Sequence, residues 1–200
     1  KEQFLMAATE GPGAVPDTFL HHRGDHEQPK EKIAPAPLEV LSPGPPVSFT
    51  KPTPELTTTG RRLAFSQWLT SGHHPLTARV LVNHLWQLCF GSGLVRTTED
   101  FGLQGERPSH PELLDWLAAK LIESGWSVKA LHKLIVMSAT YRQGSAFNES
   151  AARVDSDNRL LWRYAPRRLE AEAVRDAVLV ASGQLNAVGG GPSFRPFTTT

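Results

Sequence analysis

The stretch from Pro75 to Phe90, PLTARVLVNHLWQLCF, constrains the fold more than any other part of the chain. Its main apolar side chains recur at the spacing of one helical face: Leu76, Val80, Leu81, Leu85, Leu88 and Cys89. A second apolar stripe lies beside Arg79 and Asn83, and it comprises Val82, Trp86 and Phe90. A helix that is apolar on more than one side is usually buried among several other elements. The pattern therefore predicts that residues 75–90 form a central, buried helix.

Four further segments have apolar residues at helical spacing. They cover residues 61–70, about 111–123, about 128–142 and about 167–182. Ser109 and Glu112 have the spacing of a capping box, and Ser127 is a predicted N-cap. Residues 144–157 are polar and predict a loop, followed by a short helical turn at 158–164. We therefore predict an all-α fold of about five main helices around the central helix.

Residues 1–56 have a different character from the rest of the chain. We expect a short helix over 1–10 and a short strand within 15–22. Prolines then recur at positions 29, 35, 37, 43, 45 and 46, which exclude a helix and disfavour a central strand. This composition predicts an extended proline-rich arm, with an interdomain linker as the alternative. The predicted division is thus 1–56 for the arm and 57–200 for the helical domain, together forming one structural unit.

Charge and cysteine content exclude several classes of protein. The formal net charge is +1 at pH 7, which predicts neither a nucleic-acid partner nor an anionic membrane. No stretch has the length of a transmembrane helix, so we predict no membrane insertion. Cys89 is the single cysteine, which excludes an internal disulfide, and its apolar setting predicts a buried small hydrophobe. The chain opens with Lys1 rather than Met, and we expect it to be a fragment of a longer protein.

Three long segments of the chain resemble one protein family, and they follow one another in the same order as in that family. They read LTARVLVNHLWQLCFGSGLVRTTEDFG, GERPSHPELLDWLAAKLIESGWSVKALHKLIVMSATYRQ and DNRLLWRYAPRRLEAEAVRDAVLVASGQL. They are similar to the C-terminal domain of unknown function in large exported planctomycete proteins, which often carry an upstream c-type cytochrome module. The chain departs from the usual sequence pattern of the family at His84, where an arginine is common, and at His21 and His22, where aliphatic residues are usual.

The resemblance implies a location and partners but no known activity. It implies export to the cell envelope or the exterior, within a multidomain polypeptide. The expected partners are other domains of that polypeptide or a cell-surface component. No C-x-x-C-H haem signature occurs in the chain, so we expect no cofactor here, and any haem would belong to an upstream module.

The loop 96–112 is the best candidate for chemistry. Asp100, Glu106 and His110 are candidate catalytic residues, because two carboxylates near a histidine suit acid–base work on a glycan or ester. On the preceding helix and in the loop, the candidate binding residues are Arg79, Asn83 and Arg107. The alternative is structural, because a long loop between packed helices needs polar side chains for its backbone groups. In that alternative, Arg79 pairs with Asp100 across the core.

A second cluster, HHRGDH at 21–26, combines imidazoles with a carboxylate. Such groups suit zinc or copper, and the candidate ligands are His21, His22, Asp25 and His26. Ordered metal sites usually fix their ligands with a helix or a closed knuckle, and the sequence predicts neither here. We therefore predict no metal site and interpret these side chains as solvated loop residues.

These observations leave three hypotheses about function. The leading one is a non-catalytic helical interaction or scaffold module of an exported multidomain bacterial protein. The first alternative is a hydrolase-like or carbohydrate-binding module with its site at the loop 96–112. The second is an accessory domain to a c-type cytochrome redox protein, which rests on the family resemblance alone.

Overall fold

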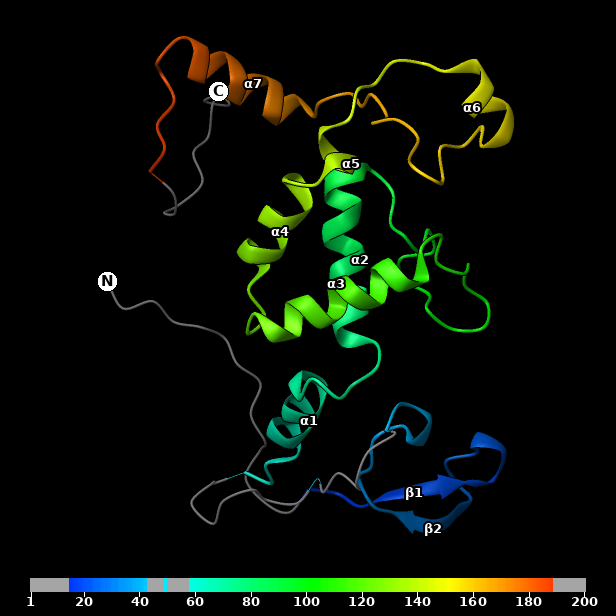
Figure 1. The fold of residues 1–200 in the computed structure, drawn as a ribbon. Helices are drawn as coiled ribbons and strands as arrows, with labels where there is room; N and C mark the ends of the chain where they lie inside the picture. Colours follow the sequence, from blue (N-terminus) through cyan, green and yellow to red (C-terminus); the bar gives the residue numbers. More distant parts are fainter. Residues whose placement is uncertain (1–14, 43–48, 50–57, 189–200) are drawn as a thin grey trace, which may run out of the picture. The chain divides into compact units, whose positions relative to one another are not determined.

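A computed structural model describes residues 15–42, 49 and 58–188 of the chain (Figure 1). The predicted helix over 1–10 and the prolines at 43, 45 and 46 lie outside these described residues. The chain divides into two compact units, Lys1–Tyr164 and Ala165–Thr200. The predicted boundary at 56/57 stays a prediction.

The described part of the chain is mostly helical. In the first unit the helices are α1 (Arg61–Thr70), α2 (Thr77–Phe90), α3 (Pro111–Glu123), α4 (Val128–Val136), α5 (Ala139–Arg142) and α6 (Glu149–Val154). The second unit holds α7 (Ala171–Ala181), which begins four residues later than about 167. Within the described structure every residue of α7 is exposed except Leu179, which is half-buried.

The prediction of a strictly all-α fold is wrong, because two strands precede the helices. The strands β1 (Thr18–His21) and β2 (Pro29–Ile33) pair antiparallel. A tight turn joins them through the 3-10 segment η1 (His22–Gly24), where Arg23 and Gly24 adopt positive φ angles of 51° and 80°. Pro29 stands at the first position of its strand, where a missing N–H is tolerated. A second 3-10 segment, η2 (Glu39–Leu41), follows in the proline-containing stretch.

The hydrophobic core lies where α2 meets α3 and α4. Helix α2 contributes Ala78, Val82, Trp86, Cys89 and Phe90 to it, each less than a tenth exposed. Its other buried members come from the following loop and from α3 and α4: Leu94, Val95, Leu114, Leu117, Ala118, Leu121, Leu131 and Ile135. On α3 the buried positions match the predicted apolar face. On α2 the buried side is mainly the second predicted stripe, whereas Leu88 of the predicted main face is 73% exposed. Burial of apolar surface holds these helices together.

Three predicted segments after α3 differ from the structure. The helix expected over about 128–142 breaks at Met137, and Ser138 then caps the short α5 by accepting a hydrogen bond from Tyr141 N at 3.1 Å. The predicted loop 144–157 contains α6, which Asn148 caps through Ala151 N. The predicted turn at 158–164 is not helical, and Leu161 there has a φ of 57°.

The two predicted N-caps have opposite outcomes. Ser127 caps α4 as predicted, because its Oγ accepts a hydrogen bond from Ala130 N at 3.2 Å. The capping box at Ser109 is wrong. Ser109 N donates a hydrogen bond to Leu94 O at 2.9 Å, and the Ser109 hydroxyl is hydrogen-bonded to His110 Nδ1. The N-cap residue of α3 is His110, and no side chain caps the helix.

His74 joins α1 to α2, and its Nδ1 accepts from Leu76 N at 3.2 Å and from Thr77 N at 3.1 Å. Burial lowers the pKa of His74 below its ordinary value of 6.5. The unfolded chain then binds a proton more readily, so this contribution to stability is complete above about pH 6.5 and is lost as the pH falls further.

We expect His74→Ala to lose less stability than the wild type between pH 8 and pH 5 in thermal melts. The exposed neighbour variant His73→Ala should keep the wild-type dependence, and an unchanged slope for His74→Ala would contradict the assignment.

Candidate functional site

Asn83 connects α2 to the chain that follows it. The residue is completely buried, its Nδ2 donates to Val95 O at 2.9 Å, and Val95 N donates to its Oδ1 at 2.9 Å. A Cβ atom on Gly93 would lie 2.6 Å from Asn83 Nδ2, so this approach requires glycine. Both ends of the amide are therefore occupied by backbone groups, and this candidate binding residue has a structural role.

The predicted pairing of Arg79 with Asp100 is wrong. Arg79 Nε instead donates to Asp115 Oδ1 of α3 at 2.7 Å, and the two side chains are 36% and 57% exposed. Asp100 accepts a hydrogen bond from Gly102 N at 2.7 Å, so its carboxylate stabilises its own turn. Exposed ion pairs contribute little to stability, so the Arg79–Asp115 pair does not replace the predicted clamp across the core.

The three candidate catalytic residues each have a separate contact. Thr97 Oγ1 donates to Asp100 O and accepts from Glu106 N, both at 2.9 Å, which joins the two ends of the loop. The Glu106 carboxylate pairs with Arg159 at 3.2 Å, and His110 contacts Ser109. Within the described residues, no hydrogen bond or ion pair joins the side chains of Asp100, Glu106 and His110. Arg107 is exposed. These contacts favour the structural interpretation of the loop.

The histidine cluster of the hairpin does not converge on one point. His22 Nδ1 meets Gln28 Oε1 at 3.2 Å, and Asp25 accepts from Gln28 Nε2 at 2.6 Å and from Glu27 N at 3.0 Å. Across residues 15–42, 49 and 58–188, no three His, Cys, Asp or Glu side chains are grouped to hold a metal ion. Asp25 serves the turn between β1 and β2.

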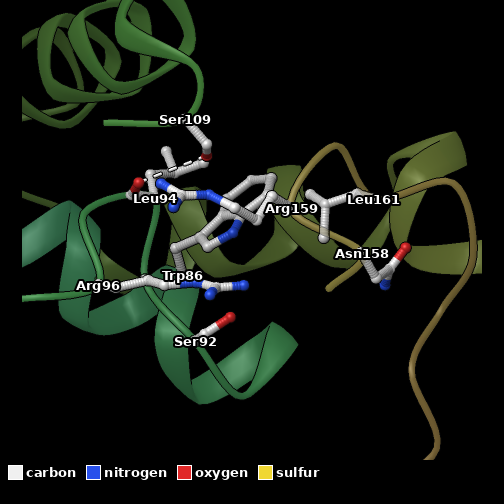
Figure 2. A pocket seen from close by; sticks show the side chains of 9 residues that line it. Trp86, Ser92, Leu94, Arg96, Ser109, Asn158, Arg159 and Leu161 are labelled. Atoms are coloured by element: carbon white, nitrogen blue, oxygen red, sulfur yellow. Dashed lines mark hydrogen bonds between the residues drawn. The ribbon is translucent and has the colours of Figure 1, made fainter. Parts of the chain in front are cut away.

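A small hollow, here named the arginine recess, lies between the start of the loop and the segment after α6 (Figure 2). Its free volume is about 20 Å³. Its lining residues are Trp86, Ser92, Gly93, Leu94, Arg96, Ser109, Asn158, Arg159 and Leu161. Figure 2 shows that Arg96 and Arg159 reach it from segments far apart in the sequence. The sequence did not single out Arg159, because nothing local indicates that residues 158–161 fold back to the loop.

Several hydrogen bonds hold that returning segment in place. Gln143 Nε2 donates to Leu161 O at 2.9 Å, and the Tyr164 hydroxyl donates to Cys89 O of α2 at 2.9 Å. Asn158 uses both ends of its amide on the backbone of Arg163. Leu161 and Tyr164 also pack against the core. The position of Arg159 is therefore fixed by its neighbours along the chain.

A larger apolar hollow, here named the α3–α4 groove, has a volume of about 310 Å³. Its lining residues are Trp86, Leu113, Trp116, Leu117, Leu134, Ile135, Met137, Ser138 and Thr140. Trp116 is 47% exposed and Met137 is 58% exposed, so both lie open to solvent at its edge. Trp116 belongs to α3, and Met137 is the residue at which α4 ends.

The described residues thus define a mostly helical domain with a polar loop network, a small arginine-lined recess and an apolar groove. A family model described as PSD1, protein of unknown function (DUF1553), matches residues 61–200, and the chain belongs to this family. No curated protein and no solved structure matches the chain. Each helix within the described residues is too short or too polar to cross a membrane.

Proposed function

We propose that this domain is a non-catalytic interaction module that binds an amphipathic helix from another domain of the same exported polypeptide. The observation that carries the proposal is the α3–α4 groove. Its volume of about 310 Å³ falls within the range of known binding sites, and apolar side chains dominate its lining. The export of the polypeptide rests on the family resemblance.

The spacing of the groove residues favours a helix as the occupant. Leu113, Trp116 and Leu117 lie within about one turn of α3, and Leu134 of α4 lies three residues before Met137, the C-cap of that helix. Apolar side chains spaced three or four residues apart on a third helix would fit between these two rows. A half-exposed tryptophan at the edge is a typical anchor for such contacts.

Charge at the rim favours acidic residues at one end of that helix. Lys129 lies in the first turn of α4, near the turn that joins α3 to α4, where Lys120 already pairs with Glu123 at 2.7 Å. Lys133 lies one helical turn before Met137. Within the described residues, Lys129 and Lys133 form no ion pair, whereas Glu112 lies at the opposite end of α3. An occupant with carboxylates near the lysines is therefore complementary.

A pair of designed peptides tests this proposal. We expect a labelled amphipathic peptide of about 16 residues, with leucines on one face and glutamates beside them, to bind in fluorescence anisotropy titrations. Met137→Glu introduces a negative charge at an exposed position of the groove, where it repels the glutamates of the peptide. It should weaken binding by at least about tenfold. A peptide with lysines in place of the glutamates should bind more weakly.

The matched control is Val154→Glu, which introduces the same side chain at an 85% exposed position on α6, outside the groove. It should bind the acidic peptide as the wild type does. Absence of binding by the acidic peptide, or equal losses for Met137→Glu and Val154→Glu, would refute the α3–α4 groove as the binding surface.

A further inference from the structure

We propose that the arginine recess is a binding site for an oxyanion, one oxygen of which enters between the side chains of Arg96 and Arg159. This site is separate from the α3–α4 groove, with which it shares Trp86 as a lining residue. The class of ligand is a carboxylate, sulfate or phosphate group, because these share the same recognition chemistry: negatively charged oxygens that accept hydrogen bonds from guanidinium groups.

The charges that line the recess are both positive. Arg96 and Arg159 line it, and no carboxylate does. Glu106 contacts Arg159 at 3.2 Å and Asp157 contacts Arg96 at 3.9 Å, but neither acidic residue belongs to the lining. An anion placed between the two guanidinium groups is attracted by both of them, in competition with Glu106 and Asp157.

The two guanidinium groups retain donors for a ligand. Each guanidinium has five N–H donors. Among the described contacts, Arg159 uses one terminal nitrogen on Glu106, and Arg96 uses its terminal nitrogens on the carbonyl and carboxylate of Asp157. The contacts of Arg96 are long, at 3.4 and 3.9 Å, so a better placed oxyanion would compete with them effectively. The Ser92 hydroxyl adds a further donor to the lining.

The size of the recess limits what enters it. A free volume of about 20 Å³ holds about one water molecule, and thus one ligand oxygen. The remainder of a sulfate, phosphate or carboxylate group would stay at the mouth. Trp86 is 5% exposed and Leu161 is half-buried, so one wall of the recess is apolar. An apolar wall lowers the local dielectric constant and strengthens the attraction between the guanidinium groups and an anion.

Thermal melting of the chain tests the proposal directly. We expect a saturable rise in Tm when sulfate, phosphate or acetate replaces chloride at constant ionic strength, because a ligand that binds the folded state stabilises it. Saturation by acetate at the lowest concentration would identify a carboxylate ligand, and saturation by sulfate or phosphate would identify a tetrahedral one. A rise that is linear and equal in all variants would overturn the proposal.

Two variants shift the affinity in opposite directions. Arg159→Gln removes one guanidinium and should raise the half-saturating concentration by at least about tenfold. Glu106→Gln removes the carboxylate that competes for Arg159, and it should lower that concentration several-fold. This second variant keeps the test decisive even if Arg159→Gln folds poorly. Arg153→Gln, whose side chain is 77% exposed on α6, is the control and should match the wild type. Unchanged or weaker binding by Glu106→Gln would overturn the proposal.

Discussion

Replacement of Asn83 by alanine is expected to lower the free energy of unfolding by about 3–5 kcal/mol, because it leaves two buried backbone groups without partners. The groups are the N–H and the carbonyl of Val95, each 2.9 Å from the Asn83 amide, in a place where Val95 itself is 2% exposed. The measurement is urea unfolding followed by circular dichroism.

Leu88→Ala is the control for this prediction. Leu88 lies on the same helix and is 73% exposed, so its truncation should change stability by no more than about 0.5 kcal/mol. Equal stability of Asn83→Ala and the wild type would show that Asn83 is not needed for folding. That outcome would return this residue to the set of candidate binding residues.

Gly105→Ala is expected to cost about 2–4 kcal/mol, because the added methyl group collides with backbone. A Cβ atom at this position would lie 2.1 Å from Asp100 O and 3.0 Å from the carbonyl carbon of that residue. A backbone group cannot swing aside as a flexible side chain can. The loop would have to open, and the contacts of Thr97 with Asp100 and Glu106 would be lost with it.

Gly144→Ala provides a matched comparison for the same substitution. A Cβ atom at Gly144 would meet nothing within 4 Å, and neither Gly105 nor Gly144 has a positive φ that would strain an alanine. The difference in stability between the two variants therefore isolates the steric term. Equal Tm values for Gly105→Ala and Gly144→Ala would show that the loop has no fixed conformation in solution.

The sequence predicted the helical elements well where apolar periodicity is strong. The bounds of α1, α2 and α3 differ from the predicted ranges by at most about two residues, because apolar residues recur at helical spacing in all three segments. The prediction was wrong where the side chain of a serine or an asparagine determines where a helix begins. Ser138 divides one predicted helix in two, and Asn148 starts another within a predicted loop, each by a single side-chain hydrogen bond to the backbone.

The candidate site was predicted less well than the helices. The sequence placed the polar loop 96–112 correctly between two helices, and its structural interpretation agrees with the contacts of Thr97 and Asp100. The partner of Arg79 was wrong, because Asp115 and Asp100 are equally plausible until the angle between α2 and α3 is known. Arg159 was missed for a related reason: it reaches the recess through a contact between segments about 60 residues apart.

The single thiol of this chain is a natural reporter of local opening. Cys89 is 5% exposed near the end of α2, where its carbonyl also accepts the hydrogen bond from Tyr164. A thiol reagent therefore reaches the sulfur atom after this end of the helix separates from the returning segment, or after global unfolding. The ratio of the labelling rates in the folded and unfolded chain then gives the equilibrium constant of that opening under native conditions. One cysteine, present without engineering, makes the coupling between α2 and the segment that carries Arg159 measurable without denaturant.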